Sequence, residues 1–247
     1  MADEPFLLVR SAVADLRDGG RIAPHTHDWH QLIYVGAGLA VVRAGHGTWL
    51  APPNWAVWVP AGTDHAIRFI GRSALRTLYL RPEWRAGLPS SCGALAVSPL
   101  LRELVLRASA TGMLDGRDEG ENALAVLIAS EIREGGTPAV ALPEPTSAAT
   151  IAAAERAVPG HSPESTASIA RAVGLSPRTL ERRFLAETGM AFGRWRQHRR
   201  LLLGLEQIAT GAPVKIAAAG AGYASSSAYV AAFRSLFATT PGRYFRH

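Results

Sequence analysis

Residues 165–184 read STASIARAVGLSPRTLERRF, and this stretch decides the fold of the C-terminal part of the chain. A short apolar segment around Ile169 leads to a turn at Gly174. Ser176 and Pro177 then form a typical helix start, because a serine hydroxyl accepts from the first turn and proline has no N–H to leave unpaired. The stretch therefore predicts two short helices joined by a tight turn.

The second of these helices has two different faces. Leu180 and Phe184 are four residues apart and share one face, whereas Arg178 and Arg182 share roughly the opposite one. We expect the first face to pack and the second to read DNA. The pattern is that of a helix-turn-helix motif.

Charge is distributed unevenly along the chain. The net charge is +6, but residues 1–147 hold 13 Arg and 15 Asp+Glu, a net charge of −2. Residues 148–247 hold 12 Arg, one Lys and five Glu, a net charge of +8. Because basic side chains release counterions from phosphates, this imbalance favours salt-sensitive DNA binding by the second half. A solvated basic surface is the alternative.

Length and composition limit the class of protein. The chain has 247 residues, 48% of them hydrophobic, which suits one large or two modest globular domains. The N-terminus lacks the layout of a signal peptide, and no eighteen apolar residues run together. We therefore expect a cytoplasmic protein with no membrane partner. Cys92 is the only cysteine, which excludes an intramolecular disulfide and a thiolate metal cluster within one chain.

The chain changes character at two places. Residues 6–80 alternate β-branched and aromatic residues with Gly, Pro and Asn, which predicts a small β-barrel or sandwich. After Pro82 the pattern becomes helical, and the Gly- and Pro-rich residues 136–147 predict a linker. We therefore expect an α+β protein with a β domain and accessory helices over residues 1–135 and an all-α domain over residues 148–247. Its predicted helices are about 148–158, 165–172, 176–186, 192–209, 214–221 and 226–237.

Two apolar stripes lie between the β region and the linker. Ser98 and Pro99 start one amphipathic helix, whose stripe runs from Leu100 to Val105. A second helix, from about residue 118 to residue 134, carries the other stripe from Leu124 to Ile132. The stripes either cover a face of the barrel or make the protein a homodimer.

Residues 213–237, PVKIAAAGAGYASSSAYVAAFRSLF, repeat the first helix-turn-helix in outline, with Ser225 as the cap. Over IARAVGLSPRTLERRFLAETG and GYASSSAYVAAFRSLFATTPGRYFR, the sequence resembles the AraC family of bacterial transcription regulators. In that family two helix-turn-helix units are joined by a linking helix. The resemblance implies that the second helix of each unit enters one of two successive major grooves of double-stranded DNA, about 34 Å apart.

The resemblance also implies which residues contact DNA. Arg178, Glu181 and Arg182 would face base edges, because arginine binds guanine with two hydrogen bonds and glutamate accepts from cytosine. The matching residues of the second unit are small, so we expect that unit mostly to clamp phosphates. The basic helix between the units offers further phosphate contacts, unless its arginines are simply exposed. The predicted DNA-binding residues are Arg178, Thr179, Glu181, Arg182, Arg183, Arg196, Arg199, Arg200, Ser226, Ser227, Ala228 and Arg234.

The β region contains a set of histidines at regular spacing. His25, His27 and Gln31, followed by PAGTDH ending at His65, resemble the two cupin motifs, whose residues converge on a divalent metal inside the barrel. On one extended strand His25, His27 and Gln31 would point to the same face, whereas His30 would point away. We expect a neighbouring strand to supply His65.

This donor set defines the expected cofactor. Three imidazoles and an amide oxygen suit Zn, Ni, Co, Fe or Mn, and the affinity order does not choose among these metals. The alternative is a metal-free barrel, as is usual for AraC-type sensors, whose histidines line the site of an organic effector. Trp49, Trp55 and Trp58 are expected either to line that ligand pocket or to belong to the core or rim of the barrel.

These expectations describe a sequence-specific transcription regulator with a cupin sensor of a metal or small molecule, and not an enzyme. One rival is a metal-dependent cupin enzyme, of the dioxygenase or isomerase type, with an accessory DNA-binding domain. No acidic or basic partner for catalysis stands in a diagnostic arrangement. The other rival is a non-specific architectural DNA binder, against which the predicted reading face from Arg178 to Arg182 argues.

Overall fold

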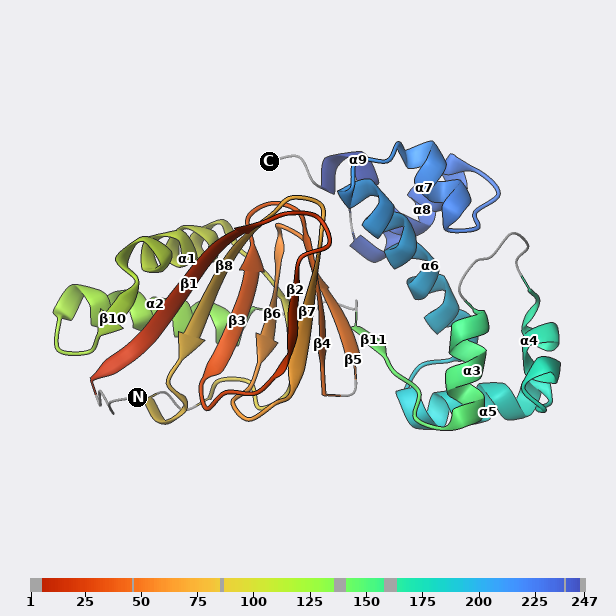
Figure 1. Cartoon of the computed structure of the whole chain (residues 1–247), viewed down its shortest axis with the longest axis horizontal. Helices are drawn as coiled ribbons and strands as arrows, with labels where there is room; N and C mark the ends of the chain where they lie inside the picture. Colours follow the sequence, from red (N-terminus) through yellow and green to blue (C-terminus); the bar gives the residue numbers. More distant parts are fainter. Residues whose placement is uncertain are drawn as a thin grey trace. The chain divides into compact units, whose positions relative to one another are not determined.

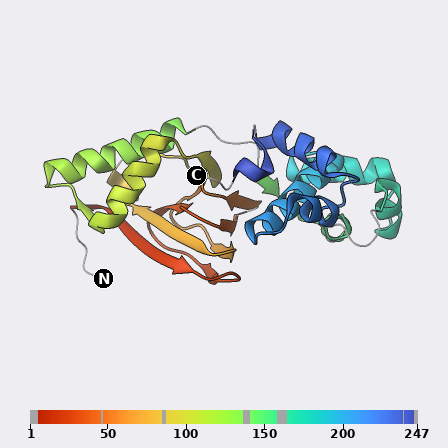
Figure 2. The same cartoon turned by 90° about the horizontal axis from the view of Figure 1, so that it is seen from above.

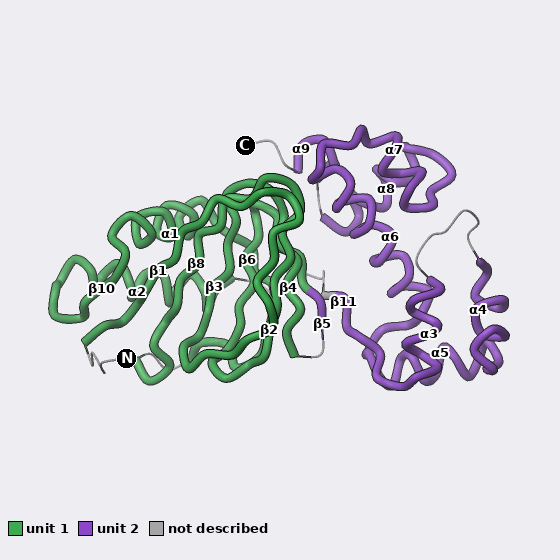
Figure 3. Tube along the Cα trace, viewed as in Figure 1, with its two compact units in different colours: residues 1–45, 49–141 green, residues 46–48, 142–247 purple. Residues whose placement is uncertain are grey.

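The computed structural model describes residues 6–45, 47–84, 87–135, 141–157, 164–237 and 239–244. The chain forms two compact units, residues 1–45 with 49–141 and residues 46–48 with 142–247 (Figure 3). The division falls within the predicted linker, whose residues 136–140 lie outside the described residues.

The N-terminal unit is built on antiparallel strands in two sheets (Figure 1). The first sheet has the strand order β10-β1-β8-β3-β6-β9 and the second has the order β11-β5-β4-β7-β2. A single-turn 3-10 helix follows β8, and part of the predicted linker forms the short strand β11. The strands are β1 (Leu7–Leu16), β2 (Arg21–His25), β3 (His30–Val35), β4 (Leu39–Ala44), β5 (Gly47–Ala51), β6 (Trp55–Val59), β7 (His65–Ile70), β8 (Ser73–Leu80), β9 (Gly93–Ala96), β10 (Met113–Asp115) and β11 (Ala141–Pro143), and the 3-10 helix is η1 (Pro82–Trp84).

Successive side chains of the first sheet enter two different cores, as the two-residue period of a strand requires. Ile33 and Leu75 pack with Phe69 of the second sheet. Leu32 and Leu78 point the other way and pack under helices α1 (Pro99–Thr111) and α2 (Glu119–Glu134). Figure 2 shows these helices along one side of the sheet. We call the side that faces the second sheet the inner face.

The caps and stripes of α1 and α2 explain their position. Ser98 Oγ accepts from Leu101 N, and the Asp118 carboxylate accepts from Glu121 N, so both helices begin where the sequence predicted. Most residues of the apolar stripes lie in the core that covers the outer face of the first sheet, which confirms the covering interpretation, although Leu127 is exposed. Leu100, half exposed, lies outside that core. The homodimer stays a prediction.

From residue 148 onward, the regular elements of the described C-terminal unit are helices. Six of its helices match the predicted ranges to within two residues at each end, and a short last helix was not predicted. The helices are α3 (Ala148–Arg156), α4 (Thr166–Ala172), α5 (Pro177–Thr188), α6 (Phe192–Ala209), α7 (Val214–Gly220), α8 (Ser226–Phe237) and α9 (Pro241–Tyr244).

The helices were also compared with the length and apolar character of a membrane-spanning segment. Among the residues that the structure describes, no helix combines the length and the apolar character needed to cross a membrane.

Candidate functional site

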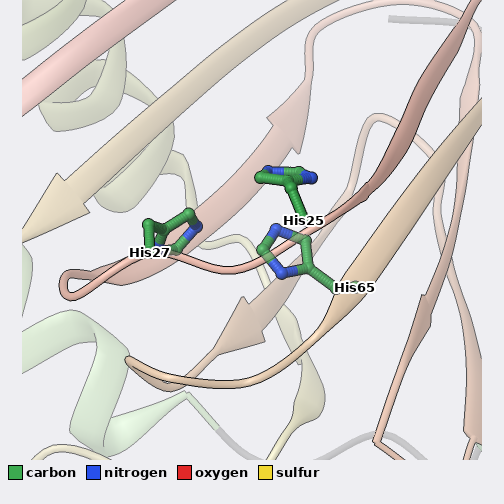
Figure 4. Close-up of side chains that lie close together, drawn as sticks. All are labelled: His25, His27 and His65. Carbon is green, nitrogen blue, oxygen red and sulfur yellow. The ribbon is translucent and has the colours of Figure 1, made fainter.

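Three histidines meet at one end of the inner face (Figure 4). His25 ends β2, His27 lies in the loop that follows, and His65 begins β7 directly opposite His25. Their ligand atoms all lie within 4.8 Å of one another. Gln31 joins them from β3, but not along one extended strand as the sequence suggested. The chain leaves the second sheet after His25 and enters the first sheet at His30, so the site spans both sheets.

Main-chain carbonyl groups determine which nitrogen of each imidazole carries hydrogen. Nδ1 of His25, His27 and His65 lies 2.9, 2.6 and 2.9 Å, respectively, from the carbonyl oxygen of a residue two positions away. A carbonyl oxygen only accepts hydrogen bonds, so each Nδ1 is the donor. In the neutral ring Nε2 then keeps its lone pair, which is the form of histidine that binds a metal.

The Gln31 amide is held in one orientation by its neighbours. Its Nε2 donates to Thr77 Oγ1 at 2.9 Å and to Tyr79 OH at 3.1 Å. Thr77 donates its own hydroxyl hydrogen to the carbonyl of Leu32 at 3.0 Å, so towards Gln31 it can only accept. The amide nitrogen must therefore face Thr77, and the amide oxygen faces the histidines.

When the rings are neutral, this orientation brings electron-pair donors together without a hydrogen between them. Gln31 Oε1 lies 2.8 Å from Nε2 of His65 and 3.1 Å from Nε2 of His27. Burial is the largest influence on His65 and lowers its pKa; the bond to the Thr63 carbonyl opposes this, and the charges of the two other histidines add to it. A metal cation relieves the repulsion between these donors without requiring protonation of a buried ring.

His30 lies outside this cluster, as its position in the sequence predicted. Its Nδ1 accepts from Ala61 N at 3.0 Å, and its ring lies 5.1 Å from the Trp58 ring. Burial lowers the pKa of His30, although Glu83 raises it. His30 is therefore a neutral packing residue beside the site.

The three tryptophans do not share a face. Trp58 is buried in the core under α1 and α2, and its Nε1 donates to the Pro89 carbonyl at 2.8 Å. The expectation that it lines the ligand pocket is wrong, because strand alternation turns it away from the inner face. Trp49 is buried in the inner-face core and Trp55 packs against that core, so their contact with a ligand stays a prediction.

The first helix-turn-helix consists of α4, a turn and α5. Gly174 occupies the turn with a φ of 71°, which favours glycine, and Ser176 Oγ accepts from Thr179 N at 3.1 Å. Leu180 and Phe184 are fully buried. The local sequence therefore builds the predicted motif.

The arginines of α5 lie on its open side. Arg178, Arg182 and Arg183 are exposed, whereas Thr179 is half-buried. Exposure and charge allow the arginines to reach phosphates or base edges. Their predicted role in DNA binding is therefore compatible with where they lie.

Glu181 has a different partner from the one expected. It is half-buried, and its Oε2 accepts from Phe192 N at 2.9 Å. Ala191, the cap residue of α6, provides no side-chain cap, so Glu181 satisfies a free N–H at the start of that helix. This contact holds the carboxylate against α6, which argues against a base edge as its partner.

The second helix-turn-helix repeats the frame of the first. Gly222 has a φ of 74° in the turn, and Ser225 Oγ accepts from Ala228 N at 3.1 Å. Tyr229 and Phe233 are fully buried. The remaining predicted contacts are small or lie farther along α8: Ser227, Ala228 and Arg234 are exposed and Ser226 is half-buried.

The arginines of α6 serve packing more than the sequence suggested. Arg196 donates to the main-chain carbonyl of Glu164. Arg200 donates to the carbonyls of Ala221 at 2.8 Å and of Gly222. Both side chains are half-buried. These guanidinium groups hold chain segments together, and a phosphate contact by Arg196 or Arg200 stays a prediction.

Arg199 is also half-buried and lies on α6. Its Nη1 is 3.8 Å from the carboxylate of Glu206, which lies further along the same helix. Such a pair adds little stability at a surface. A phosphate contact by Arg199 stays a prediction.

A β unit with a converging histidine set and a helical unit with two helix-turn-helix motifs define a DNA-binding regulator with a ligand-binding domain. Comparison with known families agrees with this class. Residues 13–117 match the AraC-like ligand binding domain, and residues 169–247 match a helix-turn-helix domain. The chain belongs to the AraC family of transcriptional regulators.

Individual proteins resemble the chain to different degrees. The HTH-type transcriptional regulator NimR of Escherichia coli (strain K12) is 28% identical over 223 residues, which cover 89% of this chain and 81% of NimR. A crystal structure of ToxT from Vibrio cholerae with a bound unsaturated fatty acid matches 99% of this chain and 96% of that chain, with 13% identity and a TM-score of 0.39. A cupin superfamily protein from Desulfitobacterium hafniense matches 33% of this chain and 71% of that chain, with 22% identity and a TM-score of 0.28.

Proposed function

We propose that the N-terminal unit of this regulator senses a divalent transition metal, alone or together with a small molecule. Occupancy of the site would change how the C-terminal unit binds DNA. The regulator would act in the cytoplasm, where its DNA target lies, and as a homodimer. The exposed part of α1, around Leu100, is the surface we propose for the dimer contact.

The residues that would hold the metal are His25, His27, His65 and Gln31. Their donors are three imidazole nitrogens and one amide oxygen, which suit Zn, Ni, Co, Fe or Mn. Metal–nitrogen bonds of about 2.0–2.1 Å put two ligands of one ion at most about 4.2 Å apart. The ligand atoms of the three histidines lie within 4.8 Å of one another, so the rings would move inward to bind one ion. A bound metal would supply a Lewis-acidic centre for an oxygen or nitrogen of an effector.

One observation carries this proposal: the orientation of Gln31. Thr77 and Tyr79 turn its oxygen towards two nitrogens that already carry lone pairs. A glutamine that served only packing would turn its N–H groups to those nitrogens, because a buried acceptor without a donor is costly. The arrangement is therefore suited to a cation.

The test is the metal content of full-length protein purified without chelators. Native mass spectrometry and elemental analysis should find one divalent ion per chain, and His65→Ala should lose it. His30→Ala is the matched control, since His30 lies beside the site but outside it. Wild-type protein that takes up no metal from Zn, Ni or Co solutions contradicts the proposal.

Thr77 offers a finer test of the same site. Thr77→Val removes the acceptor that orients Gln31, and we expect metal affinity to fall about 10- to 100-fold, as for other residues that orient ligands. Thr77→Ser keeps the hydroxyl and should retain the metal. Equal affinities for both variants contradict the role assigned to Gln31.

For DNA, we propose Arg178 and Arg182 as the principal base-reading residues. Both are exposed on α5 and carry side chains that recognise guanine. We propose that further residues make additional DNA contacts: Thr179, Arg183, Arg199, Ser226, Ser227, Ala228 and Arg234. Glu181 is instead proposed to position α6. Gel-shift titrations with and without metal test whether the sensor controls this binding.

A further inference from the structure

Arg10 on β1 differs from Arg76, the other arginine in the described strands of the first sheet. The carbon at the centre of its guanidinium lies 4.5 Å from the centre of the Trp29 ring. Its Nε is buried and has no hydrogen-bond partner among the residues that the structure describes. Arg76, by contrast, pairs with Asp15 at 3.3 Å. Because charged donors removed from water are normally paired, Arg10 has donor capacity that the described chain does not use.

Arg10 lies in one row with the histidine site. It stands opposite Tyr79 in the β1–β8 ladder, and Tyr79 stands opposite Gln31 in the β3–β8 ladder. Directly opposed residues of antiparallel strands point to the same face, so Arg10 is on the inner face with Gln31. Strands are about 4.8 Å apart, which places Arg10 about 10 Å from Gln31 along the row.

Tyr79 connects the two ends of this row. Its hydroxyl oxygen accepts from Gln31 Nε2 at 3.1 Å, and its ring meets the His27 ring edge-on at 5.1 Å. The hydroxyl hydrogen makes no hydrogen bond to any described residue. Tyr79 can therefore hold Gln31 and still donate to a bound molecule.

We propose that Arg10 and Tyr79 bind the acidic group of an organic anion, so that the effector of this regulator is a small carboxylate. Stacking on Trp29 leaves the in-plane N–H groups of the guanidinium for the two oxygens of a carboxylate. Tyr79 adds a third hydrogen bond, and the rest of the molecule extends along the row towards the histidines. The inference rests on the proposed sensor role of this unit, but it does not need a bound metal.

The direct test compares acids with their uncharged analogues on full-length protein. Benzoate and hexanoate, with benzamide and hexanamide as controls, are titrated by calorimetry and by thermal shift at constant ionic strength. Both carboxylates should bind and raise the Tm. The amides should bind at least about tenfold more weakly, because they lack charge-assisted hydrogen bonds. Inorganic phosphate should also bind more weakly, because it lacks the organic part that extends along the row towards the histidines.

Variants assign the binding to Arg10. Arg10→Met keeps the stem against Trp29, removes the guanidinium, and should weaken carboxylate binding about tenfold or more. Arg76→Met removes a charge from the same sheet and should bind as the wild type does. Arg10→Lys should give an intermediate carboxylate affinity. If Arg10→Met does not fold, the affinity of Arg10→Lys tests the role of Arg10 instead.

Several results would overturn the inference. They are no carboxylate binding by wild-type protein, equal binding of acid and amide, equal binding of phosphate, and unchanged affinity in a folded Arg10→Met protein. The metal content of the same samples separates this inference from the metal proposal. Protein that binds carboxylates but no metal supports the inference and contradicts the metal site. Protein that binds metal but no carboxylate contradicts the inference and supports the metal site. Carboxylate binding that leaves DNA affinity unchanged overturns the sensor role.

Discussion

The two helix-turn-helix units of this protein share a buried design and differ on their open faces. Each has a glycine of positive φ in its turn, Gly174 or Gly222, and each second helix begins after a capping serine. Each second helix also buries two large apolar residues four positions apart. Yet α5 exposes three arginines where α8 exposes serine and alanine. Buried residues therefore determine the motif, and exposed residues determine what each copy can do with DNA.

The second helices of the two helix-turn-helix units, α5 and α8, also contact neighbouring helices by different means. In the first unit, α5 supplies Glu181 to the start of α6 and Glu187 to the start of α3. In the second unit, α8 has no acidic residue, and its Tyr229 packs against α6 at Gly204. The first attachment depends on charge and the second on shape. Each can be broken separately.

Gly204→Ala should have the largest effect, because it breaks the attachment by shape. A Cβ at this position would lie 2.6 Å from two atoms of the Tyr229 side chain, which is fully buried and cannot move aside. Overpacking of this kind costs up to about 3 kcal/mol, more than the roughly 1 kcal/mol that alanine gains in a helix. We expect the free energy of unfolding of the C-terminal unit to fall by about 2 kcal/mol in urea titrations.

Gly193→Ala on the same helix is the control. The nearest atom to a Cβ there is Glu181 Oε1, at an ordinary 4.0 Å. This variant should be as stable as the wild type or slightly more so. Similar losses at both glycines would mean that close packing at Tyr229 is not what attaches α8.

Arg182→Ala should have the next largest effect, and it acts on DNA binding. An arginine that makes two hydrogen bonds to guanine contributes about 1–2 kcal/mol to discrimination, so affinity for the operator should fall about 5- to 30-fold. Affinity for unrelated DNA should fall much less. Gel-shift titrations on both DNAs at one salt concentration measure the difference. A uniform loss on both would reduce Arg182 to a phosphate contact.

Glu187→Gln should have a smaller effect that depends on pH, because it weakens the attachment by charge. Burial opposes ionisation of Glu187, but hydrogen bonds from Thr150, Ser147 and Thr146 outweigh it and lower the pKa to about 2. A lowered pKa in the folded state stabilises the fold above the ordinary value of 4.5, and this stabilisation disappears as the pH falls towards 2.

The expected loss at pH 7 is about 1 kcal/mol, comparable to that of a missing helix cap and limited by solvent screening. Urea titrations of wild type and Glu187→Gln should differ most above pH 4.5 and converge towards pH 2. Glu155→Gln, at an exposed glutamate of α3, should show no such trend. A gap that does not change with pH would exclude the ionised carboxylate as its cause.

Local patterns in the sequence were enough to predict α1 to α8, but not the short helix α9. Ser98, Asp118 and Ser176 cap the helices that they were expected to start. These contacts lie within one turn of the chain, so residue spacing describes them fully. The convergence of His25 and His65 was also predictable, because motif spacing reflects which strands are neighbours.

Contacts between distant segments were not predictable in the same way. Glu181 was predicted to contact bases because its place on the helix favours that role. Its hydrogen bond with Phe192 N joins residues eleven positions apart, and the local sequence does not indicate such a contact. Arg200 looked like a phosphate contact although carbonyl groups of another turn hold it. Trp58 was misplaced because a run of buried strand residues hides which face each one takes. The missing information in each case is tertiary packing, which one sequence does not contain.

Ser227→Ala should have the smallest effect and gives the sharpest comparison of the two units. Ser227 is exposed on α8, and its hydroxyl offers at most one hydrogen bond to a base or phosphate, so operator affinity should change by no more than about threefold. Arg182→Ala on the same operator provides the scale. The proposed division of labour requires the serine to matter much less than the arginine, since both helices stand on equivalent frames. Losses of equal size in the two variants would mean that both units read bases and that the size and charge of exposed side chains do not rank them.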